Sequence, residues 1–215
     1  MRTFMLWIAG LMVILSSGCM EGNKDEVLPI LGRRDVQEKE VNGEIRYDTL
    51  YHTIEPFAFV DQDSTWVKND TFSDKVYVAD FFFTSCPSIC PIMKTQMLRI
   101  YDKYEDNEQV SFLSHSIDPI HDSVAVVKEY AERLGVKSDK WHFITGAKED
   151  IFEIAQNSYF SVAAEDKDAA GGLIHSGKFL LIDKQGRIRG AYDGTNPEDV
   201  DKLIDDIALL LNEYS

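Results

Sequence analysis

The segment VADFFFTSCPSICPIM, residues 78–93, decides the fold expected for this chain of 215 residues. It belongs to a β-branched and aromatic run, residues 76–83, which is typical of a strand buried on both faces of a sheet. Cys86 and Cys90 follow this strand, and apolar residues then recur at helical spacing. Pro91 suits the first turn of a helix, because its missing N–H is not needed there. The pattern therefore places both cysteines between a buried strand and a helix.

Strands and helices are predicted to alternate along the rest of the chain. The stretch from residue 47 to 67 is divided by the turn-prone DQDS and is expected to form an N-terminal strand pair. A polar loop is expected at residues 161–172. Further strands are predicted at 110–118, 141–146, 177–183 and 187–194, and further helices at 122–135, 148–160 and 196–214. This alternation, with a hairpin near the end, predicts one α/β domain over residues 46–215.

The composition excludes several classes of protein. A hydrophobic content of 44% with 11% aromatic residues excludes wholesale disorder. The formal net charge of −15, without any Lys/Arg-rich run, argues against nucleic acid as a partner. An acidic surface keeps a protein soluble and also suits docking to a basic partner, and the composition does not separate these roles.

The first residues have the pattern of an export signal. Arg2 precedes an apolar stretch at residues 4–15, which is too short for a confident membrane span, and SSGC follows at 16–19. This end resembles a bacterial lipoprotein box, which makes residues 1–18 a signal peptide and Cys19 the lipidated end of the mature protein. An uncleaved anchor is the alternative. Polar residues 19–45 are expected to form a flexible tether, so both alternatives place the domain outside the cytoplasm, on a membrane of the cell envelope.

Cys86 and Cys90 are the thiols that remain when Cys19 carries lipid. They can form a stabilising disulfide, act as a redox couple or bind a metal. A disulfide that closes so short a loop removes little chain entropy, which favours a functional role over a structural one. A helix N-terminus favours a thiolate, so we expect the pKa of at least Cys90 to be lowered.

A third ligand decides whether the thiols suit a metal. Two thiolates and one imidazole are appropriate for Cu(I), whereas a structural zinc site needs four protein ligands. Of five histidines, His175 lies between a glycine-containing loop and a late strand, where a side chain can face the strand-end cysteines. His115 is expected in the core or beside the ligands. The remaining three are expected to be surface or packing residues: His52, His121 and His142.

Four segments together resemble the Sco/SenC family of membrane-anchored copper proteins. They are TSCPSICPIM (84–93), SIDPIHDSVAVVKEYAERLG (116–135), WHFITG (141–146) and HSGKFLLIDKQGRIRGAYDGT (175–195). The resemblance extends from about residue 47 to residue 214. It implies a thioredoxin-like fold with a mixed sheet and an N-terminal β extension.

The same resemblance implies a site and a role. One copper ion, as Cu(I) or Cu(II), would be bound by Cys86, Cys90 and His175. The family serves assembly of the copper A centre of cytochrome c oxidase, by delivering copper, by reducing the target cysteines, or by both. The implied partners are the oxidase subunit with that centre and other copper chaperones or a thiol reductant.

The chain departs from the family pattern beside the ligands. Family members often carry an aspartate between the cysteines and another directly before the histidine, where this chain has Ser88 and Ile174. Two fewer carboxylates make the site less anionic, with consequences for affinity and redox poise. Asp118 is the remaining candidate carboxylate, with a turn-capping role as the alternative.

Two enzyme classes are the alternatives to a copper chaperone. An extracytoplasmic thiol:disulfide oxidoreductase of this fold generally has two residues between its cysteines and a cis-proline facing them. Here three residues separate the cysteines, and no proline lies between Pro119 and Pro197. A peroxidase would need a threonine three residues before the attacking cysteine, whereas Thr84 is two before Cys86. The spacing and the soft ligands favour copper handling.

Overall fold

The structure is a computed structural model that describes residues 27–166 and 172–215. The expected signal peptide and Cys19 lie outside these residues. A five-stranded sheet forms the centre, in the order β11-β10-β5-β6-β7. Its strands are β5 (Val76–Phe82), β6 (Val110–Ser116), β7 (Trp141–Ile144), β10 (Lys178–Ile182) and β11 (Ile188–Asp193). All of them agree with predicted strands.

Strand β5 lies in the middle of this sheet. All seven of its residues are buried, as its apolar sequence predicts. It runs parallel to β6, which runs parallel to β7, and it is antiparallel to β10. Strands β10 and β11 form the predicted hairpin, where Gly186 has a φ of 74° that suits glycine in a tight turn. The sheet is therefore mixed, with parallel strands after β5 and an antiparallel pair on its other side.

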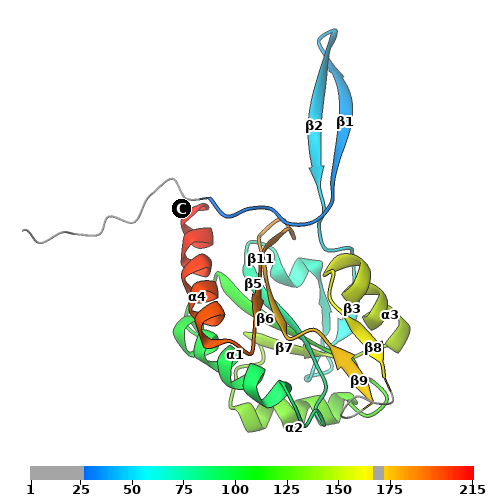
Figure 1. The fold of residues 1–215 in the computed structure, drawn as a ribbon, viewed down its shortest axis with the longest axis vertical. Helices are drawn as coiled ribbons and strands as arrows, with labels where there is room; N and C mark the ends of the chain where they lie inside the picture. The colour runs from blue at the N-terminus through cyan, green and yellow to red at the C-terminus, as the bar shows by residue number, and fades with distance from the viewer. Residues whose placement is uncertain (1–26, 167–171) are drawn as a thin grey trace, which may run out of the picture.

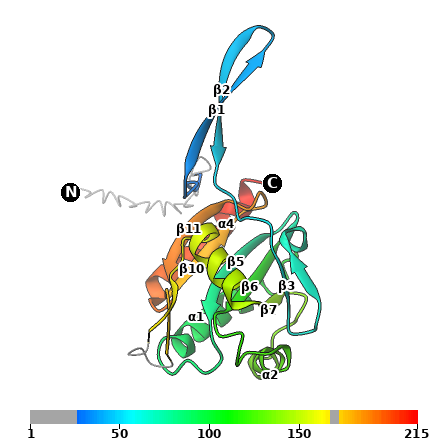
Figure 2. The same ribbon diagram turned by 90° about the vertical axis from the view of Figure 1, so that its right-hand side faces the viewer.

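Helices cover both faces of the sheet (Figures 1 and 2). One face carries α1 (Cys90–Tyr104), α2 (Val124–Leu134) and α4 (Pro197–Asn212), and the other carries α3 (Lys148–Glu153) with a π-helical turn at Ile154–Ser158. Successive side chains of β5 point to opposite faces of the sheet. Phe82 packs near Tyr130 of α2 on one face, and Phe81 packs near Tyr159, which follows the π-helical turn, on the other. None of the described helices is long and apolar enough to cross a membrane.

The strand pair expected before β5 is present. Strands β3 (Ala58–Val60) and β4 (Trp66–Lys68) are antiparallel and flank the DQDS turn. Asp61 stabilises this turn, because its carboxylate accepts the N–H groups of Asp63 and Thr65, each at 2.9 Å. Val60 also exchanges backbone hydrogen bonds with Thr145, at 3.0 and 3.3 Å. The β extension is thus attached to the edge of the central sheet beside β7.

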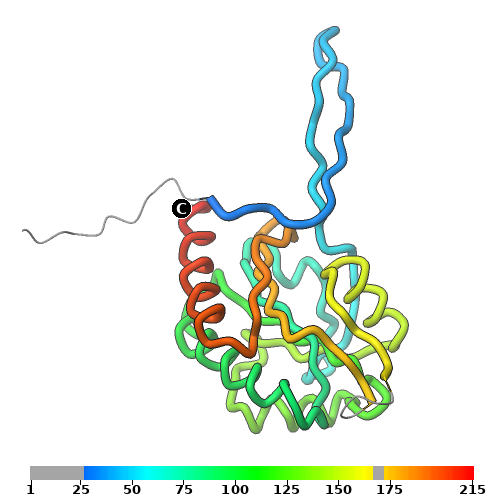
Figure 3. The backbone as a smooth tube through the Cα atoms, viewed as in Figure 1, coloured from blue at the N-terminus to red at the C-terminus, as the bar shows by residue number. Residues whose placement is uncertain are grey.

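Two segments contain more regular structure than the sequence indicates. Residues 34–45 were expected in a flexible tether, but β1 (Arg34–Val41) pairs with β2 (Glu44–Tyr51) in a hairpin that rises from the domain (Figure 3). Asn42 and Gly43, with φ of 57° and 81°, form its turn. β8 (Ala163–Glu165), which lies within the expected polar loop, pairs with β9 (Leu173–His175), which directly follows that loop. A search for buried periodicity misses both ribbons, because β1 and β2 are exposed throughout and β8 and β9 have only three residues each.

The chain before this hairpin is held on the domain. Arg189 donates hydrogen bonds to the carbonyls of Leu28, at 2.6 Å, and Pro29, at 3.2 Å. The N–H of Leu31 donates to Ile188 O at 2.8 Å. Glu213 of the chain's C-terminal end accepts from both Leu28 N–H and Arg189. These contacts anchor the base of the hairpin beside β11.

A buried ion pair joins β5 to α1 beneath the cysteine segment. Lys94 Nζ lies 2.7 Å from Asp80 Oδ2, and both side chains are almost fully buried. Ser114 of β6 donates to Asp80 and accepts from both Lys94 and Trp141. The Lys94 ammonium also lies 4.5 Å from the centroid of the Phe82 ring. Because every polar group of this network has a partner, the charges are tolerated in the core.

We expect Lys94→Met to lower the free energy of unfolding by about 3 to 5 kcal/mol, because it leaves the Asp80 carboxylate buried without its cation. Denaturation by urea measures the loss. The double variant Asp80→Asn/Lys94→Met buries no charge and is expected to recover most of the stability. A loss under about 1 kcal/mol for Lys94→Met would contradict this account of the pair.

Candidate metal centre

Cys86 lies in the turn between β5 and α1. Its N–H donates to Phe83 O at 3.2 Å. The preceding Thr84 donates its N–H to Asp122 Oδ2 at 3.0 Å and its hydroxyl to the other oxygen of that carboxylate. Ser116, at the end of β6, donates to Asp122 at 2.6 Å. The buried Asp122 therefore clamps the turn that presents Cys86.

Asp122 is a site residue that the sequence does not reveal. Its position before the α2 pattern marks it as an ordinary helix-start residue, because aspartate is common there. The contact with Thr84 joins residues 38 apart in the chain. Only the parallel pairing of β5 with β6 brings them together.

Cys90 is the first residue of α1, as predicted. Pro91 follows it within the first turn, and no side chain caps this helix end. The thiol does not point to solvent, since only 3% of Cys90 is exposed. The helix start therefore holds the second sulfur in a buried position.

His175 ends β9 and reaches the same place from the other side of β5. Its Nε2 lies 3.0 Å from Cys90 Sγ. Its Nδ1 lies 3.2 Å from the backbone oxygen of Ser176, to which the ring N–H donates. Phe83 packs edge-on against the imidazole, with centroids 5.9 Å apart. The Ser176 hydrogen bond fixes the tautomer that leaves a lone pair on Nε2, directed at the sulfur.

The ligand atoms of Cys86, Cys90 and His175 all lie within 4.8 Å of one another. This is the one group of three or more His, Cys, Asp or Glu with metal-ligand spacing among the described residues. All three residues are buried, and both cysteines are free thiols. The sequence-predicted set is thus brought together from three separate segments. Two soft sulfurs and one nitrogen form a donor set that suits copper.

The pKa values of the two thiols move in opposite directions. Burial raises the pKa of Cys90 well above its usual value, and its hydrogen bond to Cys86 acts in the same sense. The expectation of a lowered pKa for Cys90 is therefore wrong. Burial also disfavours the Cys86 thiolate, but hydrogen bonds from Cys90 and Ser88 outweigh this effect and lower the pKa of Cys86. At neutral pH these shifts favour the thiolate form at Cys86 over that at Cys90.

Burial lowers the pKa of His175, although the hydrogen bond to Ser176 O partly opposes this effect. A lowered pKa keeps the imidazole neutral at neutral pH, and neutral imidazole is the form that binds a metal. His175 is therefore a neutral imidazole with the lone pair of Nε2 unprotonated, as a metal ligand requires.

The other histidines lie away from the ligand atoms. His115 is buried among aromatic rings, 4.7 Å from the centroid of Phe81, and burial lowers its pKa to about 4. His142 contacts Asp61 at 3.0 Å, and His52 contacts Ser158 O at 2.7 Å. His121 is exposed and pairs with Asp118 at 2.9 Å. All four have the packing or surface positions expected of them.

The residues at the family's aspartate positions have different surroundings. Ser88 Oγ lies 3.6 Å from Cys86 Sγ, within reach of a weak hydrogen bond to sulfur. Ile174 is 39% exposed. Asp118 accepts from His121 and stabilises the turn after β6, which favours its capping role over a role at the ligands.

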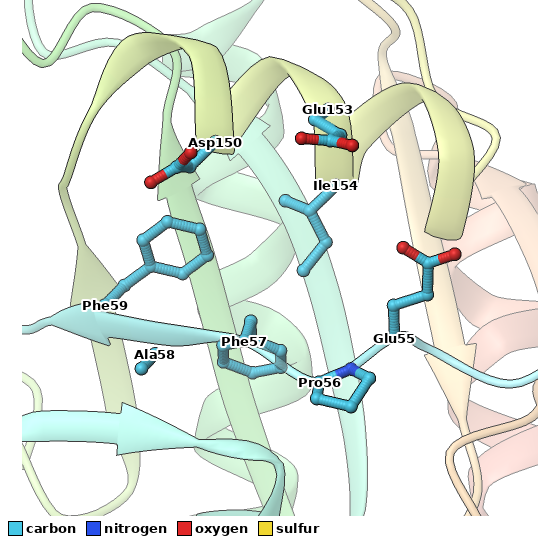
Figure 4. Close-up of a pocket in the computed structure, with 8 residues that line it drawn as sticks. All are labelled: Glu55, Pro56, Phe57, Ala58, Phe59, Asp150, Glu153 and Ile154. Carbon is cyan, nitrogen blue, oxygen red and sulfur yellow. The ribbon is translucent and has the colours of Figure 1, made fainter.

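A separate cavity of about 330 Å³ lies between the β3 segment and α3 (Figure 4). Its walls include apolar side chains such as Phe57 and Ile154, and the carboxylates of Glu55, Asp150 and Glu153 lie around them. No cysteine or histidine lines it. It lacks the soft ligands of the Cys86–Cys90–His175 group.

Fold and site together define a thioredoxin-like protein with a two-sulfur, one-nitrogen metal centre at the end of its central strand. The chain belongs to the SCO1/SenC family, whose model matches residues 46–212. The SCO1 protein homolog of Bacillus subtilis is 32% identical over 162 residues, which cover 74% of this chain and 83% of the homolog.

Solved structures agree with this membership. BsSco, described as a member of the Sco family of cytochrome c oxidase assembly proteins with a disulfide switch, is 30% identical, with a TM-score of 0.65 over 74% of this chain and 93% of its own. Arabidopsis thaliana ScoI, solved with copper bound, is 27% identical, with a TM-score of 0.63 over 74% of this chain and 98% of its own. The expected fold class is therefore confirmed.

The opposite pKa shifts predict selective alkylation. Because a lowered pKa leaves thiolate present below the ordinary thiol range, iodoacetamide is expected to label Cys86 before Cys90 at neutral pH. Peptide mass spectrometry across a pH series measures both rates. Ser88→Ala removes one hydrogen bond to Cys86 and should move its labelling midpoint to higher pH. Faster labelling of Cys90 than of Cys86 would contradict the assignment.

Proposed function

We propose that this protein is a copper chaperone that delivers copper to the copper A site of cytochrome c oxidase, reduces the cysteines of that site, or does both. The observation that carries this proposal is the convergence of Cys86 Sγ, Cys90 Sγ and His175 Nε2 within 4.8 Å. Support also comes from ScoI with copper bound and from BsSco, a member of a family of cytochrome c oxidase assembly proteins.

Copper is the cargo in this proposal, and the protein supplies its ligands. Copper bound here is held by two thiolates and one imidazole, a set that favours the soft Cu(I) ion. Both thiols lose their protons when they bind a metal, so binding is favoured by rising pH. Because the pKa of Cys90 is raised, its deprotonation relies more than that of Cys86 on the positive charge of the bound ion. Ser176 keeps His175 in the tautomer with Nε2 available.

The same thiols can reduce a target disulfide. The Cys86 thiolate attacks one target sulfur to form a mixed disulfide, and the Cys90 sulfur then attacks Cys86 and releases the second target thiol. The target S–S bond breaks, a Cys86–Cys90 bond forms, and two electrons and two protons pass to the target. A Cys86–Cys90 disulfide cannot offer two thiolates, so this oxidation and copper loading exclude each other.

A thiol:disulfide oxidoreductase without a stable metal is the second candidate. The lowered pKa of Cys86 beside the raised pKa of Cys90 favours it, because this is the asymmetry of an attacking and a resolving thiol. The cis-proline that generally faces the cysteines of such oxidoreductases is absent from residues 27–166 and 172–215, which contain no cis peptide bond. His175 lies beside the thiols instead. The peroxidase alternative loses support because the Thr84 hydroxyl is engaged with Asp122.

The location follows from the N-terminal sequence. We place the domain in a bacterial cell envelope, outside the cytoplasm, on a lipid attached to Cys19 after removal of residues 1–18. The pattern of Arg2, the apolar stretch at 4–15 and SSGC supports this proposal.

Copper binding tests the main proposal. We expect the reduced protein to retain one equivalent of copper after desalting, with thiolate-to-copper charge-transfer bands in the Cu(II) form. His175→Ala removes a direct ligand and should weaken binding by more than the roughly 10- to 100-fold typical of changes around the ligands. His121→Ala is the matched control, because His121 is exposed and lies outside the site.

Metal analysis and absorption spectra give the readout. Stoichiometric copper with unchanged bands in His175→Ala would contradict the three-ligand site. A protein that retains no copper yet rapidly reduces a model disulfide would support the oxidoreductase instead.

Lipidation has its own test. Cys19→Ala removes the sulfur that would carry the acyl chain, so incorporation of labelled fatty acid into the expressed protein should disappear. Cys86→Ala serves as the control, because it leaves the lipoprotein box unchanged. Persistent labelling of Cys19→Ala would disprove lipidation at this residue.

A further inference from the structure

The β1–β2 hairpin projects from the domain and has the character of an unpaired interface. All 16 of its strand residues are exposed, and it forms a separate two-stranded sheet (Figures 1 and 3). A ribbon of two strands is marginally stable in water, and three or more strands with an apolar face are needed for independent stability. The SCO1/SenC match begins at residue 46, so β1 and the turn lie outside the family region.

The two faces of the hairpin differ in polarity. Directly opposite residues share a face, so the register places Val36, Ile45, Tyr47 and Tyr51 together on one side. Val36, Ile45 and Tyr47 are 67%, 64% and 65% exposed. Four charged or polar residues share this side: Arg34, Glu38, Glu40 and Thr49. The other side has only two apolar residues, Val41 and Leu50, among six charged or polar ones: Asp35, Gln37, Lys39, Glu44, Arg46 and Asp48. One face of the ribbon therefore exposes four apolar or aromatic side chains and the other face two.

The two edges of the hairpin also differ. The β1 sequence RDVQEKEV has five charged residues among eight, whereas the β2 sequence EIRYDTLY has three. Charged side chains, lysine above all, discourage pairing at a strand edge. The β2 edge is therefore the one open to another strand.

The charges of the hairpin are incompletely paired within one copy. Arg46 lies directly opposite Lys39, an unfavourable juxtaposition of like charges. Lys39 contacts Asp48 at 3.0 Å, while Arg46 has no ion pair among the described residues. A strand that brings a carboxylate opposite Arg46 would correct this imbalance.

We propose that two copies of this chain associate through their β2 strands to form a four-stranded antiparallel sheet. The register is centred on Tyr47, which lies opposite Tyr47 of the second copy. Arg46 then lies opposite Asp48 of the second copy, and the symmetry repeats this pair. Ile45 lies opposite Thr49 of the second copy, so the two faces that carry Ile45, Tyr47 and Tyr51 join into one surface.

This arrangement fits the shape of the molecule. In the same register Gly43 of the second copy lies beside Tyr51, the last residue of β2, so the two β2 strands overlap along their whole length. The hairpin and β9, which carries His175, lie at opposite ends of the molecule (Figures 1 and 2). The dimer therefore leaves both metal centres accessible.

Sedimentation equilibrium of the complete chain in detergent tests the proposal. The chain is expected to dimerise reversibly, and Arg46→Asp should raise the dissociation constant by about tenfold, because it places two like-charged pairs across the seam. The double variant Arg46→Asp/Asp48→Arg restores opposite charges and should return the constant to within about threefold. A chain that stays monomeric, or a dimer unaffected by Arg46→Asp, would overturn the proposal. The β2 edge would then be assigned to pairing with a strand of another protein.

Crosslinking locates the seam independently. In a background of Cys19→Ser, Cys86→Ser and Cys90→Ser, Tyr47→Cys should oxidise to an intermolecular disulfide, because opposite residues in antiparallel strands lie within disulfide range. Thr49→Cys, on the same face of the same strand, faces Ile45 of the second copy and should crosslink far less. If Gln37→Cys formed the intermolecular disulfide and Tyr47→Cys did not, the two copies would pair through β1, which would contradict the proposed register.

Discussion

The complete burial of β5 is the constraint on which the rest of the structure depends. A strand covered on both faces can end only at the edge of the sheet, so the residues that follow it emerge there and enter α1. Cys86 and Cys90 occupy this exit, and the antiparallel return of the chain through β10 beside β5 brings His175 to the same edge. Two neighbouring cysteines and a histidine 85 residues after Cys90 thus converge, because β5 ends at the edge where the chain returns before β10.

Burial also decides the electrostatics of the centre. A helix N-terminus stabilises a nearby anion by about 0.3 to 1 kcal/mol, whereas removing a charged group from water costs several kcal/mol. For Cys90, which starts α1 but is almost inaccessible, the second effect prevails and raises its pKa. Cys86 keeps a lowered pKa because its neighbours donate hydrogen bonds to the thiolate. One short turn therefore contains one thiol with a lowered pKa and one with a raised pKa.

Polar contacts inside the core connect the elements that carry the centre. Asp122 holds the turn before Cys86, and the Asp80–Lys94 pair connects β5 to the helix that starts at Cys90. By contrast, the β1–β2 hairpin makes no use of this core and has every strand residue exposed. The buried Cys86–Cys90–His175 group and the exposed β1–β2 hairpin thus lie at opposite ends of the molecule.

The sequence by itself determined the central strands and helices, the position of both cysteines and the selection of His175 from five histidines. These features depend on local periodicity, cysteine spacing and a family motif, all of which are visible along the chain. Only the tertiary structure decided the pKa order of the thiols, the Asp122 clamp, the Asp80–Lys94 pair and the pairing of residues 34–41 with 44–51. Desolvation, contacts between distant residues and strand pairing of exposed segments arise from packing in three dimensions, so no local pattern encodes them.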